Sequence, residues 1–440
     1  MTAHASPHDP AVSRPSPVWA CLLFTFINSV ATGVTFNGIP FINEQVFGYG
    51  LATNSALGIA LGITYVIGAM YTGTFVRWAE RTWAWCTPRA VLAVMMVCGA
   101  CLNLLPVTVW FSLKPEHRET HAQWAVWAFV ALYSMLCGGL WPIVESFTSG
   151  GRGASLSRVI GKFNVTWSSA LVLSLWLVSA VPLGLQKSWA LLGLTLHDLD
   201  ARVLLFAVMA LLHLLAAAVL LRLQPRPGSH DHTSHATPPG YAPLLRLHRA
   251  LMPVSYLVCY ALNPFMPTMF AALHISTPWQ PIFGSTWLAA RPVTFFVMDH
   301  WRGWHGTRFT AIAGSVCTLG GFSACVIATL LGPTVGIPVA AVALAAFGAG
   351  MAMIYVAALY YGMEVGAAAV DEGGKHEALI GMGYTIGPLC GIGAAAAVSI
   401  GVVAQPSTAL LSLVALASLG GGSWLLRRSR TAGAATASSR

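Results

Sequence analysis

The sequence predicts an all-α integral membrane protein with about twelve transmembrane helices, arranged as two pseudo-symmetric six-helix bundles. Of its 440 residues, 56% are hydrophobic and only 8% are charged, and its mean hydropathy is +0.69. Soluble domains carry about a quarter charged residues. Apolar stretches of about 20 residues recur along the chain, each long enough to cross a hydrocarbon core about 30 Å thick. They lack the alternation of barrel strands, so we expect helices, which satisfy their own backbone in lipid.

Apolar windows, loop charge and Pro/Gly punctuation divide the chain into twelve spans, with boundaries good to a few residues. The spans are 18–42, 52–76, 90–112, 123–148, 161–184, 201–223, 250–274, 280–299, 308–331, 335–363, 378–403 and 408–426. One break stands out, because 224–248 is rich in Pro, Gly, Ser and His and is typical of a linker. We therefore predict a tail 1–17, bundles 18–223 and 249–427 on either side of this linker, and a tail 428–440.

The basic residues are unevenly shared between alternate loops. One set of loops holds most of them, whereas the other holds only Lys114, Arg118, Lys187 and Arg202. This positive-inside bias places both termini and the linker in the cytoplasm, and we expect a multi-pass protein of the bacterial inner membrane. The net charge of +9 is therefore interpreted as a topology signal, and no nucleic-acid partner is expected.

Neither the cysteines nor the histidines predict a strong metal site, and no cofactor is expected. Cys98 and Cys101 form a C-x-x-C in mid-span with no carboxylate or His nearby, so they are interpreted as packing residues. The linker tract of His230, His232 and His235 is a weak candidate for Zn²⁺ or a similar ion. A solvated, His-rich linker is the favoured alternative, because the tract lacks a structured second shell.

Internal similarity supports the division into two halves. Glu145 ends the fourth span and precedes Gly161 by 16 positions, and Glu364 ends the tenth span and precedes Gly381 by 17. A second internal similarity relates FVRWAERTW after span two to FVMDHWRGW after span eight. Halves duplicated in this way are typical of membrane transporters, whose substrate site lies between the halves near the bilayer midplane.

Over about residues 17 to 427, the chain resembles the major facilitator superfamily. The resemblance rests on the six-plus-six topology, the long cytoplasmic central loop and degenerate loop motifs. Those motifs are Gly73 with Glu80–Arg81 in GTFVRWAERT, and Asp299 with Gly303 in DHWRGWHGTR. The acid–Arg spacing departs from the family pattern and the later glycine is missing, so no subfamily is assigned. The resemblance implies a monomeric secondary transporter in the lipid bilayer that moves a small solute by alternating access, without chemistry on it.

Arg291, in STWLAARPVTFFV, is the only formal charge well inside a predicted span. Charge is costly there, so it is a functional hypothesis by default. It could face the cavity and meet an anionic or carbonyl-bearing substrate, or it could form a structural pair or snorkel toward the cytoplasm. Asp299 lies eight positions away, about 12 Å along an ideal helix and too far for direct contact.

The resemblance also implies a cytoplasmic latch of acids and loop arginines that closes the inner gate. Glu145 would then meet Arg77 or Arg81, and Glu364 would meet Arg302. The predicted latch residues are Arg77, Glu80, Arg81, Glu145, Asp299, Arg302 and Glu364. Proton carriage by the two glutamates and plain interfacial solvation are the alternatives, and no carboxylate is expected at mid-span.

Polar amides and aromatic residues on predicted cavity-lining helices could orient a solute between apolar walls. With Arg291, the candidates are Asn28, Asn37, Trp167, Tyr256, Asn263, Trp287 and Tyr355. Hydrogen bonding between helices and interfacial aromatic belts would explain the same residues without a substrate.

Charge is concentrated in 371–377, DEGGKHE, which we interpret as the cytoplasmic loop between helices ten and eleven. The glycines that follow predict close packing of helix eleven, and the resemblance implies that its neighbour is helix two, so that Gly387 and Gly391 would meet the small face of Gly58 and Gly62. GPLCG, 387–391, resembles the G-P-x-x-G-G motif that some antiporters of the superfamily carry on helix five. Here it lies on helix eleven, so no antiport mechanism is carried over.

Two other function classes remain open. A membrane enzyme would need a facing set of His, Asp and Glu such as H-E-x-x-H, and the sequence holds none; the isolated His213 and His274 do not form one. A non-transporting sensor or assembly factor could keep the same fold. The solute, the direction of transport and the coupling ion are not predicted, and organic anions, sugars and amphipathic drugs all fit.

Overall fold

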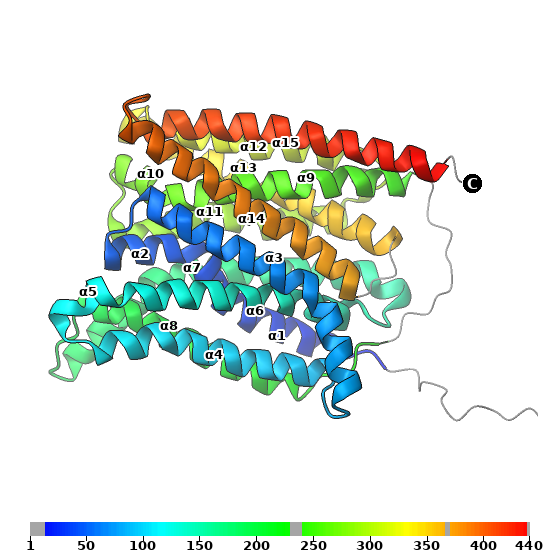
Figure 1. Ribbon diagram of the computed structural model, residues 1–440, viewed down its shortest axis with the longest axis horizontal. Coiled ribbons are helices and arrows are strands. Elements are labelled where there is room, and N and C mark those ends of the chain that lie inside the picture. Colours follow the sequence, from blue (N-terminus) through cyan, green and yellow to red (C-terminus); the bar gives the residue numbers. More distant parts are fainter. Residues whose placement is uncertain (1–13, 229–239, 366–369, 438–440) are drawn as a thin grey trace, which may run out of the picture.

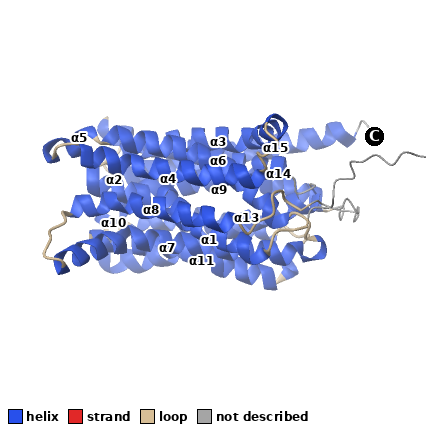
Figure 2. Ribbon diagram, turned by 90° about the horizontal axis from the view of Figure 1, so that it is seen from below, coloured by secondary structure: helices blue, strands red, loops and turns tan. Residues whose placement is uncertain are grey.

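The chain is a bundle of long helices lying roughly along one axis (Figure 1). The computed structural model describes residues 14–228, 240–365 and 370–437. Within these ranges every regular element is a helix (Figure 2). The predicted His tract of His230, His232 and His235 lies outside the described residues.

The N-terminal half makes six crossings. The first crossing is one continuous helical segment with a π-helix in its middle. It consists of α1 (Val18–Gly33), the π-helix η1 (Val34–Gly38) and α2 (Ile39–Phe47). The others are α3 (Leu51–Thr82), α4 (Pro88–Ser112), α6 (Gln123–Ser149), α7 (Leu156–Leu191) and α8 (Asp198–Leu220). The short elements η2 (Pro115–His117), α5 (Arg118–His121) and η3 (Gly153–Ser155) lie in the connections.

The C-terminal half repeats this plan. Its first crossing runs through α9 (Tyr241–Leu262), η4 (Asn263–Phe265) and α10 (Met266–Ala272). The others are α11 (Gln280–His300), α12 (Phe309–Ala328), α13 (Gly332–Val365), α14 (Val370–Ser399) and α15 (Pro406–Ala437), with η5 (Thr277–Trp279) and η6 (Arg302–Trp304) between them. Ten of the described crossings are long and apolar enough to span a membrane, and α9–α10 and α11 run beside them. The predicted all-α fold of about twelve crossings is confirmed.

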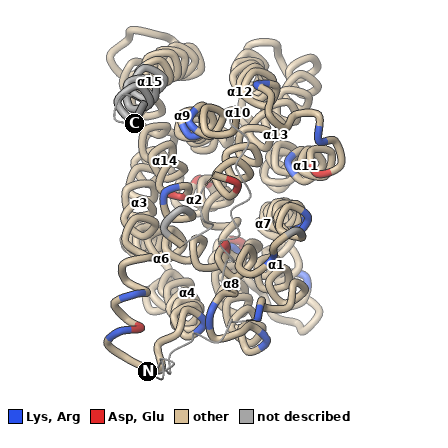
Figure 3. Tube along the Cα trace, turned by 90° about the vertical axis from the view of Figure 1, so that its right-hand side faces the viewer, with Lys and Arg blue, Asp and Glu red and all other residues tan. Residues whose placement is uncertain are grey.

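The two described chain ends lie at the same end of the bundle, which we call the termini end (Figure 1). Figure 3 looks at this end and shows α9–α15 on one side and the helices of the N-terminal half on the other. The opposite end is called the far end. α9 already begins at Tyr241, inside the range predicted as linker.

The charged stretch 371–377 differs from its interpretation as a loop, because it forms the first turns of α14. Glycines allow these turns to approach the other half. A methyl group at Gly373 would lie 2.7 Å from an oxygen of Glu145 on α6, and one at Gly374 would lie 2.8 Å from the carbonyl oxygen of Ala69 on α3. Glu377 is consequently buried, with 4% of its surface exposed, rather than solvated.

The halves meet along two seams. In the α3–α14 seam, Gly58 packs on Pro388, Gly62 on Thr385, and Gly391 on Ser55. Gly387 differs from its predicted place, because it faces Leu257 and Ala261 of α9 within the C-terminal half. Its α-carbon lies on the other face of α14.

The α7–α11 seam is polar and aromatic. Trp176 donates a hydrogen bond from its indole nitrogen to the Ser285 hydroxyl at 2.9 Å. The Trp167 and Phe295 rings lie 5.6 Å apart, and Gly161 packs against the Asp299 carboxyl group.

The π-helix η1 carries a third contact between the halves. The Phe36 carbonyl oxygen accepts hydrogen bonds from Tyr260 Oη at 3.0 Å and from Asn263 Nδ2 at 2.7 Å. Nearer the far end, the Phe41 and Phe270 rings stack with centroids 6.1 Å apart. A π-turn shifts the backbone register by one residue and is often found at functional sites. Here it presents a carbonyl group that joins the two halves.

Gly387→Ala should destabilise the protein by about 1–3 kcal/mol, because the new methyl group would overlap the Leu257 carbonyl oxygen and lie 2.9 Å from the Ala261 nitrogen. Backbone atoms cannot move aside as a side-chain end can. Gly320→Ala on α12 is the matched control, since no atom lies within 4 Å of its added methyl group. Thermal unfolding in detergent should show a lower Tm for the first variant only, and equal Tm values would contradict the packing.

Tyr260→Phe and Asn263→Ala should be non-additive. Each alone leaves the Phe36 carbonyl one of its two cross-half donors, whereas the double variant removes both and adds the cost of an unsatisfied buried acceptor, about 1–3 kcal/mol. Free energies of unfolding of the two single variants and the double variant measure this coupling. A double variant that equals the sum of the singles would show that the two donors act independently.

Candidate functional site

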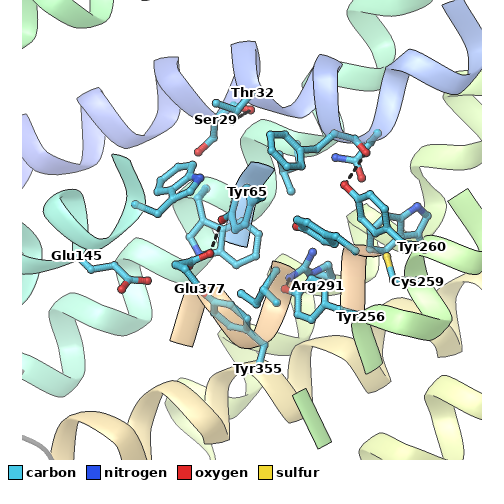
Figure 4. A pocket seen from close by; sticks show the side chains of 18 of the residues that line it. Ser29, Thr32, Tyr65, Glu145, Tyr256, Cys259, Tyr260, Arg291, Tyr355 and Glu377 are labelled. Atoms are coloured by element: carbon cyan, nitrogen blue, oxygen red, sulfur yellow. Dashed lines mark hydrogen bonds between the residues drawn. The ribbon is translucent and has the colours of Figure 1, made fainter. Parts of the chain in front are cut away.

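A central cavity lies between the halves. Helices of both halves contribute to its wall (Figure 4). The lining residues are Ser29, Thr32, Phe36, Asn37, Tyr65, Trp141, Glu145, Phe163, Trp167, Leu171, Tyr256, Cys259, Tyr260, Trp287, Arg291, Tyr355, Glu377, Ile380 and Tyr384.

Most of the predicted cavity residues lie in this wall. They are Asn37, Trp167, Tyr256, Trp287, Arg291 and Tyr355. Two others lie elsewhere. Asn28 is buried in α1 with its amide atoms unpartnered, and Asn263 in η4 donates to the Phe36 carbonyl. Asn263 therefore joins the halves instead of facing the cavity.

Arg291 is a buried cation held mainly by aromatic rings. Its residue is 3% exposed, and its guanidinium carbon lies 4.5 Å from the ring centroid of Trp167 and 5.7 Å from that of Trp287. Phe295 and Tyr355 lie near 6 Å. One Nη atom donates to the Tyr256 hydroxyl over 3.4 Å, and Nε has no hydrogen-bond partner. The proposed structural pairing with a carboxylate is not found among the described side chains, where the ion pairs are Arg118–Asp200, Arg202–Asp198 and Arg226–Glu80.

An unpaired buried guanidinium is energetically costly, and cation–π contacts offset about 0.5–2 kcal/mol each. Its free donor capacity, in a fork that suits carboxylate and carbonyl oxygens, is therefore available to a bound molecule. The aromatic residues around it offer flat apolar surfaces on which such a molecule could lie.

Two carboxyl groups also face the cavity, against the expectation of none at mid-span. Tyr65 Oη donates a hydrogen bond to Glu377, and Glu145, whose Oε2 atom has no hydrogen-bond partner, lines the same cavity. Figure 4 shows both glutamates on one side of the cavity and Arg291 on the other. Glu145 is 4% exposed.

This position differs from the predicted latch between Glu145 and Arg77 or Arg81. Both arginines lie on exposed positions near the end of α3, whereas the first turns of α14 cover Glu145 and enclose it in the cavity. The physical reason is the early start of α14, whose Gly373 leaves room for the Glu145 carboxyl group.

The other predicted latch residues lie at the termini end. Glu80 pairs with Arg226 at 2.9 Å, a residue of the connection between the halves. Asp299 and Arg302 border a smaller cavity beside Gly161 at the start of α7. Glu364 is exposed at the end of α13, and its pairing with Arg302 stays a prediction.

Sequence reasoning missed Tyr65, Tyr260, Tyr384 and Glu377. Glu377, Ile380 and Tyr384 are spaced three, four and seven apart, so they share one face of α14. That spacing would have found them had the helix been started at residue 370. Tyr256, Cys259 and Tyr260 follow the same rule on α9.

No protein-family profile matches the sequence, and no curated protein matches it at a significant level. Solved structures do match in fold. A point mutant of the nucleoside transporter NupG superposes with a TM-score of 0.62 over 93% of this chain and 99% of that chain, at 14% identity. A bacterial homologue of the human lysosomal transporter Spinster, inward-facing and unoccupied, gives 0.64 over 94% and 96%, also at 14% identity. Its occupied form gives a TM-score of 0.61. The chain therefore has the fold of these transporters.

Proposed function

We propose that this protein is a secondary transporter that moves a small solute across a membrane by alternating access. The observation that carries the proposal is the unpaired Arg291 in an aromatic cavity formed by both halves. A solute held there would touch both halves at once, so movement of one half relative to the other would change the end to which it is exposed.

The arrangement of contacts supports this mechanism. The cavity is bounded toward the far end by the Phe36 and Phe41 contacts, and toward the termini end by α14 against α3 and α6. The α3–α14 seam contains glycines, which allow the two helices to approach closely. The structures compared above are transporters, and one of them is seen both occupied and unoccupied.

The cavity chemistry favours a solute with two features. An anionic or carbonyl group would meet the Arg291 guanidinium, and a flat, largely apolar body would lie against Trp167, Trp287 and Tyr355.

The finer features of the proposal come from the sequence. The units that move are the bundles 18–223 and 249–427, and the protein acts as a monomer in the bacterial inner membrane with both termini cytoplasmic. The termini end would then be the cytoplasmic end, where Arg77, Arg81, Asp299, Arg302 and Glu364 would form the latch.

Arg291→Gln should weaken solute binding without loss of stability, because it removes a charge-assisted contact to the solute and also an unpaired buried charge. A thermal-shift screen of the purified protein against aromatic carboxylates, nucleosides and sugars would identify ligands, and uptake into proteoliposomes would test transport of those that bind. We expect about 10- to 100-fold weaker binding by the variant.

Arg308→Gln, an exposed arginine at the termini end, is the matched control and should bind normally. An Arg291→Gln variant that kept every ligand response would remove Arg291 from the site. Binding without uptake of any ligand would contradict the proposal of transport.

A further inference from the structure

Two glutamates in the described cavity wall, Glu145 and Glu377, have no role in the solute site that Arg291 and the aromatic residues form. The two carboxyl groups come from different halves, Glu145 from α6 and Glu377 from α14. Each residue is 4% exposed, both line the central cavity, and the Glu145 Oε2 atom has no hydrogen-bond partner. None of the ion pairs among described side chains includes either of them.

The groups that face the pair are mostly neutral hydroxyls. Tyr65 from α3 donates to Glu377, and Tyr256 from α9, Tyr355 from α13 and Tyr384 from α14 also lie near. The α1 and α7 parts of the wall contribute no charged side chain.

Three basic side chains lie around the central cavity and the cavity next to it. Arg291 occupies the other side of the cavity, and Arg249 and His376 border a second cavity described below. His376 is buried with its Nε2 atom unpartnered.

Two carboxylates cannot both ionise at close range in a water-poor site without a strong penalty, and one shared proton turns repulsion into a short hydrogen bond. Tyr65 already donates to Glu377, but a phenol cannot also supply the proton between the two carboxyl groups. That hydrogen bond therefore needs a proton on one glutamate.

We propose that Glu145 and Glu377 form a proton-binding site that clasps the two halves together at the termini side of the central cavity. With one proton bound, the pair carries a single negative charge and its hydrogen bond joins α6 to α14. When the proton leaves for water, both groups are carboxylates, and their repulsion separates the helices. The role of this clasp in solute movement rests on the proposed transport function.

A second cavity supplies a path for the proton. It lies toward the termini end of the central cavity. Glu145 lines both cavities, and the second one is bordered by the polar residues Ser146, Ser149, Arg249 and His376 and also by apolar residues such as Leu359 and Met363. Glu145 can thus exchange its proton with the termini side while Glu377 stays within the central cavity.

Infrared spectroscopy of the purified protein tests the shared proton without any solute. At neutral pH we expect the C=O stretching band of a protonated carboxyl group, shifted in D₂O. Both Glu145→Gln and Glu377→Gln should lose it, because the remaining glutamate can ionise while it accepts a hydrogen bond from the glutamine. Glu80→Gln, whose parent residue pairs with Arg226, is the matched control and should keep the band. A band absent from the wild type, or unchanged in both variants, would overturn the proposal.

Labelling of Cys259, a buried thiol of the cavity wall, with N-ethylmaleimide tests the clasp. Raising the pH should speed Cys259 labelling in the wild type. This increase should exceed the increase in the Glu145→Gln/Glu377→Gln double variant by about ten-fold or more, because the double variant keeps a neutral hydrogen bond. Mass spectrometry follows the Cys259 thiol, and a free thiol compound labelled in the same buffer corrects for reagent reactivity. Equal pH dependence in both proteins would overturn the clasp. Both measurements are independent of uptake, so loss of the transport proposal alone would leave these results intact.

Discussion

The cost of burying charge between the two halves is the constraint on which the central cavity depends. Arg291 is surrounded by rings and meets only one hydroxyl, at 3.4 Å, while two glutamates occupy the other side. A protein selected for stability alone would pair these charges or replace them with apolar side chains. Keeping them apart leaves the guanidinium available to a solute and the carboxyl groups available to a proton.

Small residues and one irregular turn make this arrangement possible. Glycines of α14 let its backbone approach α3, α6 and α9 so closely that Glu145 and Glu377 are enclosed. The π-helix η1 turns the Phe36 carbonyl toward Tyr260 and Asn263 of the other half. The contacts between the halves therefore include backbone packing, ring contacts and single hydrogen bonds, and each hydrogen bond can be broken and re-formed at modest cost.

The sequence predicted the crossings, the two halves and the position of Arg291 inside a span, because hydrophobic length and a charge within an apolar run are local signals. It misplaced Glu377, because four charges in seven residues, 371–377, are also the composition of a loop. What buries Glu377 is the contact of Gly373 and Gly374 with α6 and α3, which is a tertiary fact. Asn263 shows the same limit. Its amide was expected in the cavity, but it donates a hydrogen bond to the Phe36 carbonyl, which the unpredicted π-helix turns toward it.

Electrostatics also links the two proposed sites. Arg291 and the Glu145–Glu377 pair with one proton together carry no net charge, in a cavity where charges are weakly screened. An anionic group bound at Arg291 adds negative charge near the pair and makes loss of its proton less favourable. By linkage, the bound proton must favour the anion to the same degree. A neutral solute would lack this coupling, so the chemistry of the solute decides whether proton and solute bind together or independently.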